Sequence, residues 1–259
     1  MPPPVRDKMA VAGWKMAMTI GESLAFVERF PGLVGAALDV VDVCLFPPFT
    51  ALWAVSNAAR NSGVEIGGQN VADTEEPART GQVSARLLVD AGCVWVQLGH
   101  WEVRRYLGDD DATVNRKVHL ALAAGLKCLV LIGEARASQL ALQDEIVGQL
   151  DRMLAGCRPD QVAEMALMYE PEVAIGLAAP AQAQHVEECT TLLRRWVGDR
   201  FGSWAADRVR VLYGGSVSPD RAPTLLNCAN VDGLGAGRQG RNPDTFAAIV
   251  RTIALHGGG

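Results

Sequence analysis

The chain has 259 residues, a formal net charge of −5, and six cysteines that form neither a CxxC pair nor a Cys/His cluster. An acidic balance excludes a nucleic-acid-binding protein but permits a small anionic ligand, which needs only a few backbone N–H groups and one or two cations. Because no apolar run approaches the about 18 residues of a membrane span and no signal-peptide core follows Met1, we expect a cytoplasmic protein with reduced cysteines, no metal site and no membrane partner.

Short apolar segments alternate with helical segments along the sequence. Eight segments are predicted as strands, and the residues between them have the apolar spacing of helices. The predicted strands are 9–13, 41–46, 65–68, 95–99, 128–133, 165–169, 210–213 and 231–235. No linker or change of composition divides them, which indicates one domain over residues 1–259. Eight strand–helix units at this length favour an α/β protein with a closed (β/α)8 barrel over an open, doubly wound sheet.

Polar residues follow several of these strands, at the end of a barrel where catalytic residues lie. Lys15 follows the first strand and His100 the fourth. Lys15 has three interpretations: a solvated loop residue, a cation for a phosphate or an oxyanion, or the Schiff-base lysine of a lyase. His100 is either a hydrogen-bonded structural residue or a group that polarises a carbonyl and shuttles a proton.

Glu170 follows the sixth strand and precedes Pro171. A carboxylate at the lip of an apolar barrel is poorly hydrated and therefore a stronger base, although an exposed glutamate at a helix start is the alternative. The apolar segment 171–183 is predicted to close over the site as a lid. Glycines in the segments 214–216 and 235–237, after the seventh and eighth strands, predict backbone N–H groups that bind a phosphate.

Together these segments resemble the triosephosphate isomerase family, in order and spacing, over nearly the whole chain. The segments that carry the resemblance are GWKM, FPPFT, GGQN, TGQVS, GHWEVRRYLGDDD, IGEA, YEPEVAIG, VRVLYGGSVSPD and VDGLGAGR. The resemblance implies a (β/α)8 TIM barrel without metal or organic cofactor that interconverts the sugar phosphates dihydroxyacetone phosphate and glyceraldehyde 3-phosphate. It also implies a homodimer, in which the loop that carries Thr80 reaches the other subunit.

The resemblance also assigns roles to individual residues. Lys15 would be the cation near the substrate oxygens, His100 the electrophile and proton shuttle, and Glu170 the base that forms an enediolate. Glu102 would support the lysine. Gly176, Ser216 and Gly237 would line the phosphate. Two further positions depart from the family: we expect Gly13 beside the substrate, and Arg238 either binds the phosphate or points to solvent.

Several positions in the site depart from the pattern of the family. They are Gly13 (asparagine in the family), Trp101 (serine), Val103 (arginine), 172–173 (an apolar residue and tryptophan), 177–179 (Thr-Gly-Lys) and Arg238 (glycine). We expect Gly13 to open space beside the substrate and to weaken the contact between subunits. These changes resemble the family's erythrulose-phosphate isomerases of erythritol catabolism, so a four-carbon substrate is the alternative function. A catalytically inactive barrel that serves as a scaffold is a third.

Overall fold

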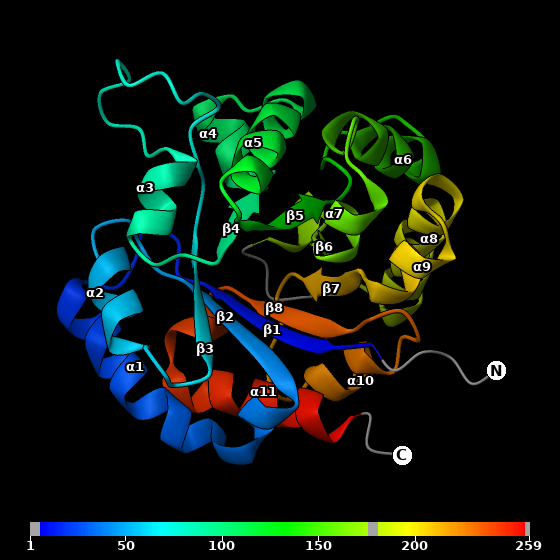
Figure 1. Ribbon diagram of the computed structural model, residues 1–259. Coiled ribbons are helices and arrows are strands. Elements are labelled where there is room, and N and C mark those ends of the chain that lie inside the picture. Colours follow the sequence, from blue (N-terminus) through cyan, green and yellow to red (C-terminus); the bar gives the residue numbers. More distant parts are fainter. Residues whose placement is uncertain (1–5, 176–180, 257–259) are drawn as a thin grey trace.

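The computed structural model describes residues 6–175 and 181–256. Eight parallel strands close into a barrel in chain order, and β1 completes the ring against β8 (Figure 1). The strands are β1 (Lys8–Gly13), β2 (Val41–Phe46), β3 (Val64–Gly68), β4 (Trp95–Leu98), β5 (Lys127–Ile132), β6 (Ala166–Tyr169), β7 (Arg210–Gly214) and β8 (Gly233–Ala236). The predicted (β/α)8 TIM barrel is therefore confirmed.

The observed strand ends differ from the predicted ones by at most two residues. The largest difference is at β8, which was expected from residue 231 and begins at Gly233. Asp232 precedes this strand, and its carboxylate accepts a hydrogen bond from the backbone N–H of Val211 at 2.7 Å and pairs with Arg194. A side chain that binds the neighbouring strand in this way cannot be read from hydropathy.

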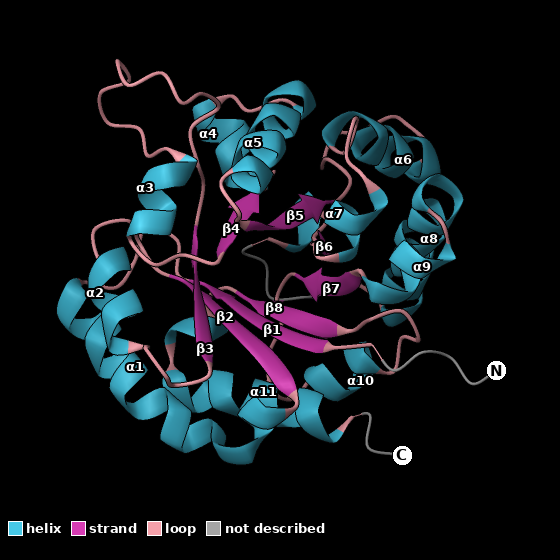
Figure 2. Ribbon diagram, viewed as in Figure 1, coloured by secondary structure: helices cyan, strands magenta, loops and turns pink. Residues whose placement is uncertain are grey.

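Helices cover the outside of the barrel (Figure 2). The α-helices are α1 (Ile20–Val34), α2 (Leu52–Ala58), α3 (Ala85–Asp90), α4 (Trp101–Leu107), α5 (Asp111–Ala123), α6 (Leu142–Met153), α7 (Pro159–Ala163), α8 (Ala183–Phe201), α9 (Ser203–Arg208), α10 (Ala222–Leu226) and α11 (Pro243–Leu255). Short 3-10 helices are η1 (Gly35–Asp39), η2 (Glu172–Ala174) and η3 (Gln239–Arg241). Side-chain N-caps begin α1, α3, α5 and α11 at Thr19, Ser84, Asp110 and Asn242, and such caps satisfy backbone N–H groups that a helix leaves free.

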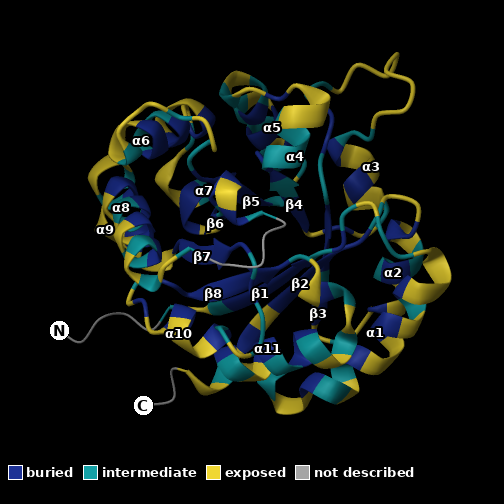
Figure 3. Ribbon diagram, turned by 180° about the vertical axis from the view of Figure 1, so that it is seen from behind, coloured by how far each residue is buried: buried dark blue, intermediate teal, exposed yellow. Residues whose placement is uncertain are grey.

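The core has two layers, because successive side chains of a strand point to opposite faces. One layer packs between the barrel and the helices, and most positions of the strands are buried (Figure 3). The other fills the inside of the barrel with Met9, Val11, Cys44, Phe46, Trp95, Leu129, Leu131, Ala166, Met168 and Leu212. A filled barrel leaves no channel through its middle, so a site must lie at one of its ends.

Candidate active site

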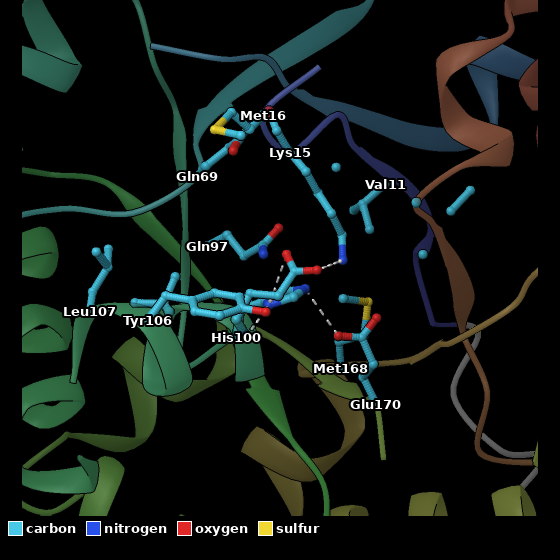
Figure 4. A pocket seen from close by; sticks show the side chains of 16 residues that line it. Val11, Lys15, Met16, Gln69, Gln97, His100, Tyr106, Leu107, Met168 and Glu170 are labelled. Carbon is cyan, nitrogen blue, oxygen red and sulfur yellow. Dashed lines mark hydrogen bonds and ion pairs between the residues drawn. The ribbon is translucent and has the colours of Figure 1, made fainter. Parts of the chain in front are cut away.

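Two adjoining cavities lie at the carboxyl ends of the strands. The first, of about 270 Å³, is lined among others by Gly13, Lys15, Gln97, His100, Glu102, Glu170 and Gly237 (Figure 4). The second, of about 510 Å³, is lined among others by Lys15, Glu102, Glu170, Ser216, Gly237, Arg238 and Arg241. The structure thus brings together the predicted site residues that it describes. Gly176 was predicted to line the phosphate and lies outside the described residues.

Lys15 enters the cavity from the end of β1 in a strained conformation. Its φ is +53°, in the left-handed region that a residue with a side chain rarely adopts. The amide of Gln69 holds this turn, because its Nε2 donates to the carbonyls of Lys15 at 2.9 Å and Phe46 at 3.0 Å. The Lys15 Nζ then lies 2.7 Å from Glu102 Oε1. An ion-paired ammonium suits a cation for substrate oxygens and disfavours the Schiff-base interpretation, which needs a nucleophilic amine.

His100 is oriented by its place between β4 and α4. It is the N-cap of α4, and its Nδ1 accepts a hydrogen bond from the backbone N–H of Glu102 at 3.0 Å. The proton of a neutral ring is therefore on Nε2, which points into the cavity. Burial lowers the pKa of His100; Glu170 and Glu102 oppose this effect and Lys15 adds to it. A neutral His100 can donate a hydrogen bond to a carbonyl oxygen, which a purely structural histidine would not do.

Glu170 lies opposite His100 at the end of β6. Its side chain is 12% exposed, and its Oε2 lies 3.4 Å from His100 Nε2. That oxygen is buried and accepts no hydrogen bond from any residue that the structure describes. Gly214 makes room for the Glu170 carboxylate, because a Cβ at position 214 would lie 3.1 Å from Glu170 Oε1. A buried carboxylate oxygen without a donor is costly, which makes this group a candidate for function.

Trp101 and Glu172 fix the backbone around Glu170. The indole N–H of Trp101 donates to the Glu170 carbonyl at 3.2 Å, and the guanidinium of Arg104 lies 5.5 Å from the indole ring. Glu172, in the first turn of the predicted lid, pairs with Arg105 and accepts a hydrogen bond from the backbone N–H of Arg136 at 2.8 Å. The sequence showed that both positions are changed but not what they bind, since these partners come from distant segments.

The second cavity has the features of an anion site. Ser216 has a φ of +48°, and its hydroxyl donates to the Ala174 carbonyl at 3.1 Å. Gly237 lines both cavities, and Arg238 is exposed at the edge of the second. Arg241 was not predicted; its Nε is buried and finds no acceptor within the described ranges. Two guanidinium groups beside glycine-rich turns can bind a phosphate.

The space beside Gly13 is bordered by the side chain of Gln97. A Cβ at Gly13 would lie 3.6 Å from the Oε1 of Gln97, which extends from β4 into the first cavity. The expectation of open space beside the substrate stays a prediction, and it did not include the Gln97 side chain, which lies across the barrel. The polar residue within the apolar segment VWVQLGH was the signal in the sequence that could have revealed it.

The sequence argues against a metal site and against a membrane span. Among residues 6–175 and 181–256, no cluster of three or more His, Cys, Asp or Glu side chains could hold a metal ion. Over the same ranges, every helix is too short or too polar to cross a membrane.

Comparisons with known proteins agree with this geometry. The family model described as triosephosphate isomerase matches residues 8–253. The triosephosphate isomerases of Solibacter usitatus and Symbiobacterium thermophilum are 37% and 38% identical to the chain, over 95% and 96% of it and 99% and 98% of their own lengths. A crystal structure of triosephosphate isomerase from Bartonella henselae superposes with a TM-score of 0.84 at 29% identity, covering 95% of this chain and 98% of that one. The chain belongs to the triosephosphate isomerase family.

Proposed function

We propose that the protein interconverts dihydroxyacetone phosphate and glyceraldehyde 3-phosphate, with Glu170 as the base. The observation that carries this proposal is the buried Glu170 Oε2, without a donor among the described residues and 3.4 Å from His100 Nε2. The Lys15 ammonium lines the same cavity. A base, a neutral hydrogen-bond donor and a cation around one space are the groups that proton transfer beside a carbonyl requires.

The reaction follows from these positions. Glu170 removes a proton from the carbon beside the carbonyl, and the electron pair of the C–H bond moves to form an enediolate. His100 Nε2–H donates a hydrogen bond to the developing oxyanion and transfers a proton between the two neighbouring oxygens, while Lys15 stabilises the negative charge. Glu170 then returns its proton to the adjacent carbon, which completes the isomerisation without any other reactant.

The phosphate belongs in the second cavity. Ser216, Gly237 and Arg238 line it, and Arg241 adds a second guanidinium. Binding the phosphate away from the reacting carbons lets its binding energy hold the substrate in register with Glu170. The part of Gly176 in phosphate binding stays a prediction.

The four-carbon alternative finds no support among the relatives. They are named triosephosphate isomerase, not erythrulose-phosphate isomerase. Gln97 also borders the space that was expected at Gly13. The scaffold alternative would leave the buried Glu170 carboxylate without a use, at a cost in stability.

Proton–deuterium exchange in heavy water, followed by NMR, tests the function directly. We expect deuterium in dihydroxyacetone phosphate together with isomer formation, and none in either erythrulose phosphate measured in parallel. Glu170→Gln should abolish the exchange, whereas Glu164→Gln makes the same change at an exposed position of the chain and should leave it intact. Exchange only in a four-carbon compound would replace the substrate, and exchange in none of the three would favour the scaffold.

We also propose that residues 1–259 form one catalytic domain that pairs with a second copy through the Thr80 loop. That loop extends away from the barrel between β3 and α3 (Figure 1). Thr80 within it is exposed. Phe49 and Leu107, both exposed apolar residues, line a groove together with residues 81–83. Sedimentation of the chain and of Leu107→Asp tests this: we expect a dimer and a monomer, and a parent that is monomeric at all concentrations contradicts it.

A cytoplasmic location belongs to the same proposal. All six cysteines lie in the described part of the chain and are free, as expected in a reducing compartment.

A further inference from the structure

Gln97 is a polar side chain at an inward-facing position of β4. Trp95, two residues earlier, is among the side chains that fill the barrel, so Gln97 faces the same interior one layer closer to the carboxyl ends. Its amide lies in the first cavity and points into the space that Lys15 enters from the other side (Figure 4). The Gln97 amide is half-buried, and it makes no hydrogen bond to any residue that the structure describes.

Two other glutamine amides at this end of the barrel are committed to the backbone. Gln69 donates to the carbonyls of Lys15 and Phe46. Gln149 accepts from the N–H of Gly133 at 3.2 Å and donates to its carbonyl at 2.7 Å. These two hold loops in place. Gln97 binds no backbone group among the described residues, so a structural role does not account for an amide at this position.

Gly13 lies next to the Gln97 amide. Gly13 is not among the glycines of positive φ, so its backbone does not require glycine. A Cβ there would make ordinary contact with Gln97 Oε1 at 3.6 Å, and a longer side chain would meet the amide. The small residue on β1 and the long one on β4 therefore fit each other and share one space.

We propose that Gln97 is a specificity-determining residue that binds the substrate oxygens at the end opposite the phosphate. This inference rests on the proposed function, since it concerns the same site. Gln97 lines the cavity that contains His100 but not the cavity of Arg238 and Arg241, so its amide meets the reacting end. During isomerisation a carbonyl oxygen becomes a hydroxyl and its neighbour does the reverse. An amide suits both forms, because its NH₂ donates to a carbonyl and its oxygen accepts from a hydroxyl.

The first test compares Gln97→Met with Gln143→Met, which makes the same change on the exposed surface of α6. The probes are 2-phosphoglycolate, whose carboxylate stands for the enediolate, and inorganic phosphate, which has no reacting end. Loss of a hydrogen bond to a charged group should weaken 2-phosphoglycolate binding by about tenfold to a hundredfold in Gln97→Met, measured by calorimetry. Phosphate binding should stay within about twofold, because one lost contact at the other end leaves it untouched.

Each outcome bears on a separate claim. Equal 2-phosphoglycolate affinity in the parent and Gln97→Met overturns the role of Gln97, whatever the turnover of the enzyme. An equal loss of phosphate and 2-phosphoglycolate binding also overturns it, because it indicates a general disturbance of the site. A parent that binds 2-phosphoglycolate through Gln97 but does not isomerise triose phosphates overturns the proposed function alone.

A second test uses the fit between Gly13 and Gln97. Gly13→Asn adds an amide from β1 into the space that Gln97 occupies and should lower kcat/KM. Gln97→Val removes the amide from β4 and should lower it too. In the double variant the amide introduced at position 13 can take the space that the Gln97 amide leaves. The kcat/KM of the double variant relative to the parent should therefore exceed the product of the relative kcat/KM values of the two single variants by about fivefold or more, as expected for residues in contact. Independent effects that simply multiply would contradict a shared substrate space.

Discussion

The two ends of the barrel differ in how their polar side chains are paired. At the N-terminal ends of the strands, Lys127 and Arg210 lie over the ring of Trp95, at 5.4 and 5.9 Å from its centroid. The indole N–H of Trp95 donates to Glu65 at 2.6 Å. Arg210 also pairs with Asp42 at 2.5 Å. Lys127, Arg210 and Glu65 thus all contact one buried aromatic side chain, and Arg210 also has a carboxylate partner.

At the C-terminal ends, some polar groups pair with one another, as Lys15 does with Glu102 at 2.7 Å, while others face the cavity without a partner in the described part of the chain. Glu170 Oε2 and the Gln97 amide find no hydrogen-bond partner among residues 6–175 and 181–256. Lys15 and Ser216 have positive φ values, which a stable turn would avoid. The difference shows where this chain obtains stability and where it gives stability up. The Glu170 carboxylate oxygen and the Gln97 amide are held around a cavity without a partner among the described residues, where a substrate can pair with them.

The largest effect should come from removing the side chain of Trp95 at the N-terminal ends of the strands. Trp95 is fully buried, and its replacement in Trp95→Ala removes the packing of the bottom layer and leaves Glu65 without its donor. We expect the free energy of unfolding in urea to fall by about 3–5 kcal/mol, while kcat/KM of the remaining folded protein stays within about twofold of the parent. A loss of activity per folded molecule would show that the two ends are not independent.

At the C-terminal ends of the strands, Glu170→Asp should lower the activity and leave the stability unchanged. The shorter side chain withdraws the carboxylate from the substrate carbon, and a displacement of this size lowers the rate by about a hundredfold, or roughly 2.7 kcal/mol. The free energy of unfolding should hardly change, because the Oε2 has no partner in the described structure to lose. Steady-state kinetics against the control Glu164→Asp measures this. A variant that keeps most of its activity would exclude Glu170 as the base.

Much of the fold was predictable from the sequence because the strands alternate regularly with helices. Residues 41–46 were predicted and observed as a strand without any shift. Lys15, His100 and Glu170 could be placed near one another because parallel strands of a barrel end at the same face. Their neighbourhood therefore follows from chain order and needs no knowledge of side-chain packing.

The remaining features depend on contacts across the barrel. Gln97 meets Gly13 from a strand that is not its neighbour, and the Trp101 indole reaches a carbonyl 69 residues away. Hydropathy and spacing describe only what lies along the chain. Changed positions could be recognised in the sequence, but their partners required the register and the direction of each side chain.

Trp101→Phe should have a moderate effect on the activity. Phenylalanine keeps an aromatic ring beside Arg104 but loses the N–H that donates to the Glu170 carbonyl. The loss of one neutral hydrogen bond that positions the base should lower kcat by about two- to tenfold. Because Trp101 acts through Glu170, KM should change little, and steady-state kinetics separates the two. An unchanged kcat would mean that Glu170 is held by the strand alone.

The smallest effect concerns pH and His100. Burial lowers the pKa of His100 below the ordinary value of 6.5, so between these two values the unfolded chain binds more protons than the folded one. Stability from a neutral His100 is therefore complete above about pH 6.5 and is lost as the pH falls toward the folded pKa. Urea unfolding of the parent and of His100→Gln at pH 7.5 and 5.5 isolates this residue, since other groups titrate alike in both. We expect the parent to lose more stability on acidification; an equal loss would mean that His100 accepts a proton as easily in the barrel as in water, and that it does not act as a neutral donor.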